Sequence, residues 1–262
     1  MAENILQIKE LITSFETESG WLRAVDKISF DVPVGKTVGI VGESGCGKSV
    51  TAMSIVRLLP QPMGQILGGE IIFDGKNLTE FDRKQMISIR GDDIGVIFQE
   101  PMTALNPSHR IGKQISEVFL LHTKMSKKEA WEASIEILRK VKIPSPELRV
   151  SEYPHQLSGG MRQRVVIAMA LACSPKLLIA DEPTTALDVT VQAQIIDLMQ
   201  ELQRDMGMSI ILITHDLGVI AQTCDEVCVM YAGRLAEKAS VEELFANPQH
   251  AYTKGLLASI PT

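Results

Sequence analysis

The stretch Gly42-Glu43-Ser44-Gly45-Cys46-Gly47-Lys48-Ser49 has the spacing G-x-x-x-x-G-K-[ST], which is typical of a phosphate-binding loop. The apolar run before it, 37–41, predicts a buried strand, and the pattern over 47–59 predicts a helix that a proline ends. Glycines between a strand and a helix let successive backbone N–H groups turn toward phosphate oxygens, and the positive end of the helix dipole assists them. We expect Lys48 to reach the β- and γ-phosphates of a nucleotide and the Ser49 hydroxyl to ligate Mg²⁺.

Two other residues of this segment need an interpretation. Val50 follows the loop directly, and we include it among the ATP-binding residues. Cys46 could be a reactive thiol in a region of positive potential or a small spacer, and the spacer is the simpler interpretation. A glycine-rich turn can arise by chance, but the flanking strand and helix are both predicted here, which favours a nucleotide site.

A second segment, 177–182, is an apolar strand that ends in two carboxylates. Asp181 is placed to hold Mg²⁺ through a water molecule. Glu182 can polarise the water that attacks the γ-phosphate. Alone, this pattern could be a strand that enters a polar loop, and its pairing with the phosphate loop is what favours catalysis.

The composition excludes several classes of protein. The chain has 262 residues, 45% of them hydrophobic and 22% charged, so it is not a disordered tail or a fibre. Its formal net charge of −6 and its lack of a basic block argue against a nucleic-acid partner, and its four scattered cysteines argue against a disulfide scaffold. No signal peptide is visible, and the longest apolar run, 165–173, has about half the length of a membrane span. We expect an intracellular, water-soluble protein that a partner holds if it works at a membrane.

Short apolar runs alternate with helical patterns along the chain, as in α/β domains. A strand is expected at 70–73, where Asp74-Gly75 begins a hairpin. Further strands are expected at 94–98, 177–180, 209–214 and 227–231. Between about residues 104 and 156 the pattern is helical and polar, with Ser126 as the N-cap of a helix over 127–141. The sequence therefore predicts one composite domain, an α/β core interrupted by a helical insertion.

The segment Leu157-Ser158-Gly159-Gly160-Met161-Arg162-Gln163 predicts another helix start, with Ser158 as its N-cap. Alone, it is either a second anion-binding helix start or a capped core helix with a loose turn. The segment resembles the signature motif of an ABC-transporter ATPase. Met161 replaces the glutamine that is commonest in that family, but the serine and the glycines are unchanged, so we expect no loss of phosphate contact.

The other motifs of that family follow in the family's order. Gln99 matches the Q-loop glutamine, Asp188 ends the D-loop segment 185–188, and His215 matches the switch histidine after a strand. The resemblance implies an α/β fold: a P-loop ABC-type ATPase core with an antiparallel β subdomain and a helical insertion. In this single ABC nucleotide-binding domain, 1–262, the segments would be an ATPase core at about 1–103 and 157–240, a helical subdomain at 104–156 and a C-terminal segment at 241–262.

The resemblance also implies a head-to-tail dimer with ATP between the subunits. Each ATP would be held by the phosphate loop of one subunit and, from the other, by Ser158, Gly159, Gly160 and Met161. Gln99 would sense Mg²⁺ and the lytic water, and His215 would hold the γ-phosphate and hydrogen-bond near Glu182. Without the family, His215 would be interpreted as a satisfied histidine at a strand end. An aromatic residue, Phe15 or Trp21, would stack on adenine, although either could be ordinary packing.

Three segments, 98–107, 153–156 and 249–257, resemble the ATP-binding subunits of bacterial dipeptide and oligopeptide importers, a group that includes nickel and glutathione importers. The resemblance implies ATP and Mg²⁺ as cofactors and a location at the cytoplasmic face of the inner membrane. The implied partners are a second ATPase subunit, identical or paralogous, two transmembrane permease subunits and an extracytoplasmic peptide-binding protein, with no nucleic acid. The implied function is ATP hydrolysis that powers peptide import.

Members of this group often carry a further C-terminal segment with cysteines for an iron–sulfur cluster. This chain ends at residue 262 without one, so we expect no cluster, and we assign Cys224 and Cys228 to the core. A soluble ABC ATPase acting on nucleic acid or ribosomes would show two cassettes, a coiled-coil insertion or basic patches, and the sequence shows none of them. A regulatory subunit without turnover is disfavoured by the intact Glu182 and His215.

Overall fold

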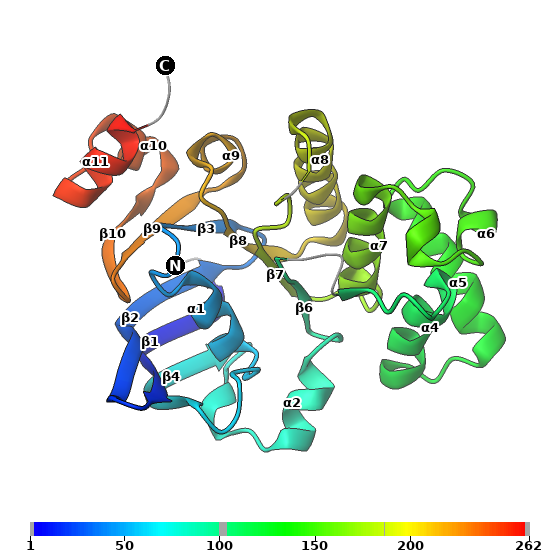
Figure 1. Cartoon of the computed structure of the whole chain (residues 1–262), viewed down its shortest axis with the longest axis horizontal. Helices are drawn as coiled ribbons and strands as arrows, with labels where there is room; N and C mark the ends of the chain where they lie inside the picture. Colours follow the sequence, from blue (N-terminus) through cyan, green and yellow to red (C-terminus); the bar gives the residue numbers. More distant parts are fainter. Residues whose placement is uncertain (1–2, 100–103, 186, 260–262) are drawn as a thin grey trace. The chain divides into compact units, whose positions relative to one another are not determined.

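The computed structural model describes residues 3–99, 104–185 and 187–259. The chain divides into two compact units, residues 1–86 with 209–262, and residues 87–208 (Figure 1). The first unit contains the phosphate loop, and the second contains the acidic strand and the signature segment. Within the described ranges, no helix is both long and apolar enough to span a bilayer.

An antiparallel sheet in the order β2-β1-β4-β5 forms one part of the first unit (Figure 1). Its strands are β1 (Asn4–Thr17), β2 (Gly20–Pro33), β4 (Gly64–Phe73) and β5 (Lys76–Asn77). The predicted hairpin at Asp74-Gly75 is confirmed, since Phe73 pairs with Lys76 across that turn. The sequence pattern does not predict the two long N-terminal strands, β1 and β2. Register shifts interrupt their alternation of apolar and polar residues.

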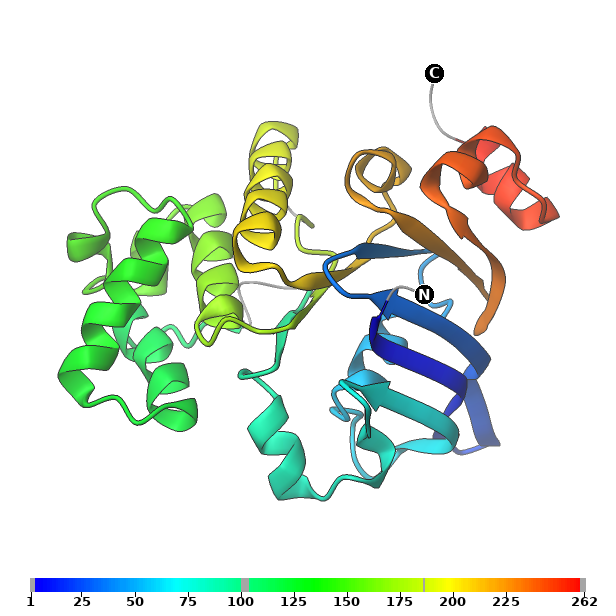
Figure 2. The same cartoon turned by 180° about the vertical axis from the view of Figure 1, so that it is seen from behind.

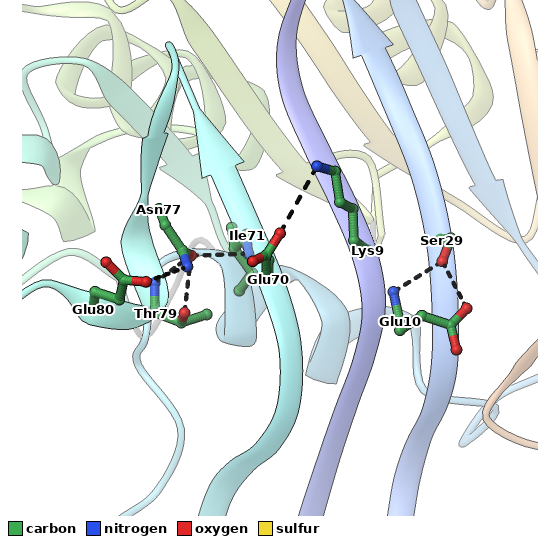
Figure 3. A network of polar contacts seen from close by, with 8 residues as sticks. All are labelled: Lys9, Glu10, Ser29, Glu70, Ile71, Asn77, Thr79 and Glu80. Carbon is green, nitrogen blue, oxygen red and sulfur yellow. Dashed lines mark hydrogen bonds and ion pairs between the residues drawn. The ribbon is translucent and has the colours of Figure 1, made fainter.

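Polar contacts tie the exposed parts of this sheet together (Figure 3). Between β1 and β4, Lys9 Nζ lies 3.8 Å from Glu70 Oε2, and between β1 and β2 the Glu10 N–H donates to Ser29 Oγ at 2.9 Å. At β5, Asn77 Oδ1 accepts from two backbone N–H groups. Exposed pairs of this kind add little stability each, so the buried face of the sheet carries most of its stabilisation.

The parallel strand β3 (Thr37–Val41) lies between β8 (Ser209–Ile213) and β9 (Glu226–Tyr231) in the first unit. Strand β10 (Arg234–Ser240) pairs antiparallel with β9, which gives the order β10-β9-β3-β8. Every residue of β3 is buried, as the continuous apolar run predicted. This core position fixes the point from which the phosphate loop leaves the sheet.

Four helices accompany these strands in the first unit: α1 (Lys48–Ile55), α9 (Leu217–Thr223), α10 (Val241–Ala246) and α11 (Ala251–Ala258). Helix α1 ends four residues before the predicted 59, because Val56 leaves helical geometry and Arg57 has a φ of 52°. The last two helices follow β10 directly, in red in Figures 1 and 2. Their partly buried side chains pack against a core cluster that includes Val41 and Val229.

The second unit combines a parallel strand pair with helices. The strands are β6 (Ile94–Ile97) and β7 (Leu177–Asp181). The helices are α4 (Ile111–His122), α5 (Lys127–Lys140), α6 (Pro146–Arg149), α7 (Gly159–Leu171) and α8 (Val189–Met206). The short turn η2 (Pro154–Gln156) also belongs to this unit. The short turn η1 (Leu78–Glu80) belongs to the first unit, and helix α2 (Arg83–Ile89) begins in the first unit and ends in the second.

The helices predicted between about residues 104 and 156 are present as α4, α5 and α6, while the boundaries of the insertion stay a prediction. Ser126 caps α5 through a reciprocal capping box with Glu129, as the sequence predicted for the start of this helix. The strands predicted at 94–98, 177–180, 209–214 and 227–231 match β6, β7, β8 and β9 to within one residue at each end. The strand predicted at 70–73 is too short, because it is only the last part of β4 (Gly64–Phe73). Cys228 is buried in β9, and Cys224, the C-cap of α9, packs against a core cluster, which agrees with the assignment of both cysteines to the core.

Candidate nucleotide site

The phosphate loop leaves the carboxyl end of β3 and runs into α1. Gly42, Gly45 and Gly47 have φ values of 151°, 80° and 108°, where an L side chain is strained. A Cβ on Gly42 would lie 2.2 Å from the Met230 carbonyl oxygen, and one on Gly47 would lie 2.5 Å from the Ala24 carbonyl oxygen. Glycine is therefore required at these two positions for space as well as for conformation.

Lys48 folds back against the loop that precedes it. Its side chain is only 6% exposed, and Nζ donates to the carbonyl oxygens of Gly42 (2.8 Å) and Glu43 (2.9 Å). The third neighbour of Nζ is the weak acceptor Cys46 Sγ, at 4.0 Å. A phosphate oxygen is a stronger partner for an ammonium group than a thiol is. The ammonium is thus positioned by the backbone and suited to an anionic ligand.

The Cys46 thiol is a poor candidate for chemistry. Burial raises the pKa of this thiol above its ordinary value, although the nearby Lys48 ammonium works in the opposite direction. A thiol that stays protonated is a weak nucleophile. The geometry agrees with its interpretation as a spacer.

Helix α1 is fixed to the sheet just beyond the loop. Ser49 and Val50, the remaining predicted residues of this segment, are half-buried in its first turn. One turn further, the hydroxyl of Ser54 bonds the Thr13 hydroxyl of β1 at 2.8 Å in a buried contact and also donates to the Val50 carbonyl. This anchor holds the amino-terminal turn of α1, and with it the loop, in one orientation.

Glu182 is the centre of a hydrogen-bonded group in the second unit. Its Oε2 accepts from Gln99 Nε2 at 3.0 Å and from the Thr185 hydroxyl at 2.9 Å. Its backbone has a φ of 47°, a conformation that non-glycine residues rarely adopt and that is frequent at functional sites. Two donors on one oxygen and a strained backbone restrict the carboxylate to one position.

Asp181 is buried at the end of β7, one residue before Glu182. Because β6 and β7 run parallel, Gln99 arrives at the same edge of the strand pair. Carboxylate, amide and hydroxyl oxygens are the donors that suit Mg²⁺. In the part of the chain that the structure describes, no group of three or more His, Cys, Asp or Glu could hold a metal. A cation at this edge would therefore need phosphate or water oxygens as further ligands.

The amino terminus of α7 is open to the surface at the signature segment. Ser158 is the N-cap, with its hydroxyl accepting from the Met161 N–H at 3.3 Å, and both Ser158 and Gly159 are exposed. A Cβ on Gly159 would meet only Leu187 Cδ2, at 3.7 Å, whereas one on Gly160 would lie 2.8 Å from Val191 Cγ1. Gly160 is thus required for close packing, while Gly159 has free space that an anion could approach.

Comparison with known proteins agrees with these features. The family model described as "ABC transporter" matches residues 25–185. The chain belongs to the ABC transporter family. A probable peptide ABC transporter ATP-binding protein of Sinorhizobium fredii is 55% identical over 99% of this chain and 78% of its own length. The oligopeptide transport ATP-binding protein of Bacillus subtilis is 55% identical over 98% of this chain and 72% of its own length.

Two solved ABC structures share the fold. A dimeric ATP-binding cassette in a post-hydrolysis state, bound to ADP and Pi, matches with a TM-score of 0.80 and 26% identity over 90% of this chain and 98% of that one. A subunit of an ABC transporter complex from Clostridium perfringens matches with a TM-score of 0.79 and 30% identity over 94% of this chain and 92% of that one. The predicted ABC ATPase fold and family are confirmed, and the chain is an ABC-type ATPase.

The remaining motif residues of this ABC ATPase have local structural roles as well. Asp188 is the N-cap of α8, its carboxylate accepting from the Val191 N–H at 3.0 Å. His215 is exposed just beyond β8 in the first unit, and the following residue, Asp216, caps α9. Ala186 of the D-loop lies outside the described residues, as do 100–103 after Gln99.

The two candidates for adenine stacking lie near the β1–β2 turn of the ABC ATPase. Phe15 is half-buried and packs over Gly64, where a Cβ would lie 2.9 Å from its ring. Trp21 is 49% exposed. Because both rings are at least partly exposed, Phe15 and Trp21 both stay candidates for the adenine contact.

Two side chains at the site have no role in our sequence-based assignment. Thr185, part of the D-loop segment, binds Glu182 directly. Tyr252 of α11 accepts a hydrogen bond from the Glu43 N–H of the phosphate loop at 3.1 Å. A local pattern could have suggested Thr185, which lies three residues after Glu182. Nothing local could have suggested Tyr252, which is 209 positions away from Glu43.

Proposed function

We propose that this ABC-type ATPase powers the import of dipeptides or oligopeptides through a separate membrane permease. The observation that carries the hydrolytic role is the Glu182 carboxylate, which is held by Gln99 and Thr185. The cargo class is supported by relatives that are 52–55% identical and are named as peptide, dipeptide or oligopeptide transport ATP-binding proteins.

In this proposal the phosphate loop binds the nucleotide and Glu182 orients the reacting water. Residues 42–50 form the proposed ATP site, in which backbone N–H groups of the loop and the Lys48 ammonium hold the β- and γ-phosphates. The Glu182 carboxylate accepts a hydrogen bond from the attacking water and directs its oxygen at the γ-phosphorus. The bond to the β,γ-bridging oxygen breaks, and ADP and phosphate leave. His215 contributes a hydrogen bond to the γ-phosphate.

The donor set also fits a divalent cation bound with ATP. Ser49, Gln99 and Asp181 offer hydroxyl, amide and carboxylate oxygens, with Asp181 acting through a water molecule. Bound Mg²⁺ supplies charge neutralisation at the phosphate oxygens. These residues remain our proposed ligands. The aromatic contact to adenine is proposed for Phe15 or Trp21, and alanine variants of each, compared for ATP against inorganic triphosphate binding, distinguish the two.

We also propose that two ATPase subunits, identical or paralogous, enclose ATP head to tail. Ser158, Gly159, Gly160 and Met161 of one subunit would contact the nucleotide held by the phosphate loop of the other, near Asp188. The exposed helix start at Ser158 and Gly159 supports this proposal, since it leaves backbone N–H groups available to an anion. A dimeric relative of known structure agrees with it.

The remaining partners follow from the proposed cargo. Two permease subunits would dock on the helical subdomain, about residues 104–156, and an extracytoplasmic binding protein would deliver the peptide. The ATPase would then sit at the cytoplasmic face of the inner membrane. The boundaries of the ATPase core (1–103 and 157–240) and of the C-terminal segment (241–262) belong to the same proposal.

Reconstitution tests this function. The complete complex in liposomes is expected to hydrolyse ATP faster when its binding protein is loaded with a peptide, and to accumulate that peptide. Stimulation by a nickel complex or by glutathione, with none by peptides, would assign the import to the alternative cargo. Absence of any transport-coupled turnover would contradict the transport role itself.

A further inference from the structure

The phosphate loop is contacted by a helix from the far end of the chain. Tyr252, in α11, accepts a hydrogen bond on its phenol oxygen from the Glu43 N–H at 3.1 Å. Its ring lies against that of Tyr231 at the end of β9, with centroids 4.5 Å apart. Tyr252 lies in the segment 249–257, which resembles the ATP-binding subunits of peptide importers, and the proposed function gives this side chain no role.

The bond to Tyr252 acts on one particular peptide group, the one between Gly42 and Glu43. Its carbonyl oxygen accepts from Lys48 Nζ at 2.8 Å, and its N–H donates to Tyr252 Oη. The C=O and N–H of a trans peptide are coplanar and point in opposite directions. The orientation that satisfies Tyr252 is therefore the orientation that presents the carbonyl to Lys48. Rotation of this peptide plane would break both bonds.

Gly42 makes this restraint necessary. Its φ of 151° lies in a region open to glycine, where a residue without Cβ has few steric barriers to backbone rotation. The Met230 carbonyl oxygen occupies the space where a Cβ on Gly42 would lie. The Tyr252 hydroxyl is thus the side-chain acceptor that opposes rotation of the Gly42–Glu43 peptide.

Tyr252 is itself held in place by contacts at the start of α11. The Glu237 carboxylate of β10 accepts from the N–H groups of Gln249 (2.7 Å) and His250 (2.9 Å). His250 then caps α11, its Nδ1 accepting from the Tyr252 N–H at 3.1 Å. The start of α11 is therefore tied to the sheet that flanks the phosphate loop.

We infer that Tyr252 is a positioning residue of the nucleotide site: its hydroxyl fixes the Gly42–Glu43 peptide and thereby places the Lys48 ammonium for the β-phosphate of a nucleoside di- or triphosphate. The inference rests on the proposed nucleotide-binding role of Lys48. It gives the C-terminal helices a function in ATP binding that is independent of any partner.

The test is Tyr252→Phe in the full chain, which removes the phenol oxygen and keeps the ring. Tyr231→Phe is the matched control, since it removes a phenol oxygen from the neighbouring ring of the same pair and leaves the bond to Glu43 intact. Calorimetric titration with MgADP and with a non-hydrolysable ATP analogue is expected to show binding about two- to tenfold weaker for Tyr252→Phe. The control is expected to match the wild type, and kcat of Tyr252→Phe is expected to stay within about twofold while KM for ATP rises in parallel with Kd.

Two further readouts separate positioning from general stability. The melting temperature of Tyr252→Phe is expected to be unchanged, and hydrogen–deuterium exchange of the loop peptide containing Glu43 is expected to be faster without nucleotide. Unchanged nucleotide affinity would overturn the inference. Equal losses in Tyr231→Phe would also overturn it, because they would show that loss of either phenol oxygen of this ring pair has the same effect, whether or not it binds Glu43. A wild-type chain that binds no nucleotide would instead contradict the proposed function.

Discussion

Glu182 combines a φ of 47° with two hydrogen bonds on a single carboxylate oxygen. A left-handed backbone at a non-glycine residue costs free energy, so the surrounding contacts must maintain it. Gln99 and Thr185 supply two of these contacts, both to Glu182 Oε2. A carboxylate restricted in this way suits a role in orienting water.

Replacing Glu182 with glutamine tests that role. The amide is nearly isosteric, so nucleotide affinity is expected to stay close to that of the wild type. Turnover is expected to fall by about 100-fold or more, because an amide cannot polarise the attacking water. Phosphate release measured at saturating MgATP checks this, with Thr185→Val as a control that loses one hydrogen bond and only part of the rate. Phosphate release near the wild-type rate in Glu182→Gln would remove Glu182 from the mechanism.

For single residues, the sequence predicts which chemical groups the candidate site contains better than it predicts the contacts that these groups make. Lys48, Asp181 and Glu182 follow from motif spacing, because spacing along a strand–loop–helix unit places them. The left-handed conformation of Glu182 and the contact from Tyr252 do not follow from it. The first depends on tertiary packing around one peptide, and the second joins residues that are far apart in the chain.

Helix α7 begins at a glycine that the fold does not need. Gly159 has no positive φ, and a Cβ there would meet only Leu187 Cδ2 at 3.7 Å. Gly159→Ala is therefore expected to leave the melting temperature unchanged or slightly raised. It is expected to lower ATP hydrolysis by about tenfold or more, because the methyl group would stand between the helix N–H groups and a phosphate.

Gly255→Ala is the matched control for this prediction. Gly255 also lies in a helix, α11, and a Cβ there would meet nothing within 4 Å. Both variants are measured for melting temperature and for ATPase activity at saturating MgATP. Full activity of Gly159→Ala would show that no ligand approaches this helix start closely.

Glu237 connects the element β10 to the start of α11. Burial by itself would raise the pKa of this carboxyl, but hydrogen bonds, including those from the backbone of Gln249 and His250, outweigh it and hold the pKa below its ordinary value. The carboxylate therefore stabilises the fold fully at pH values above its unfolded-state pKa. That contribution is lost as the pH falls through the lowered folded-state pKa.

Glu237→Gln is expected to remove this pH dependence and to lower stability at neutral pH, because one acceptor oxygen is lost. Thermal unfolding of both proteins between pH 3 and pH 7, a range that covers ordinary carboxyl pKa values, checks the expectation. The difference between them should be largest at pH 7 and should shrink toward pH 3. Parallel curves with a constant difference would show that another carboxyl controls the acid transition.

For helices and strands too, the sequence predicts the features that nearby residues determine and misses those that depend on the rest of the fold. The helix start at Ser126 and the β4–β5 hairpin follow from capping and turn chemistry within a few residues. β1 and β2 do not show the alternation of apolar and polar residues that predicts a strand, because bulges shift the pairing of β1 with both of its neighbours. The early end of α1 depends on Arg57, whose φ of 52° no local residue pattern requires.

The whole molecule carries two helix starts that we propose as phosphate-binding, and they belong to different compact units. The phosphate loop precedes α1 in the first unit, and the exposed Ser158–Gly159 start precedes α7 in the second. A head-to-tail dimer uses both on each nucleotide, since each subunit then supplies what its partner's site lacks. The isolated chain is therefore expected to be monomeric without nucleotide and to dimerise with ATP when Glu182→Gln blocks hydrolysis. Light scattering after size-exclusion chromatography checks both states.

Subunit mixing tests the shared site more strictly than mass alone. Lys48→Ala and Gly159→Ala are each expected to be inactive as homodimers, because both sites of each dimer carry the lesion. A mixed dimer places both lesions in one site and leaves the other with a native Lys48 and a native Gly159. Mixing the two inactive proteins should therefore restore ATP hydrolysis in proportion to the mixed dimers formed. A mixture as inactive as its components would contradict a nucleotide shared between two subunits. A stable dimer that forms without ATP through other surfaces would contradict the proposed assembly.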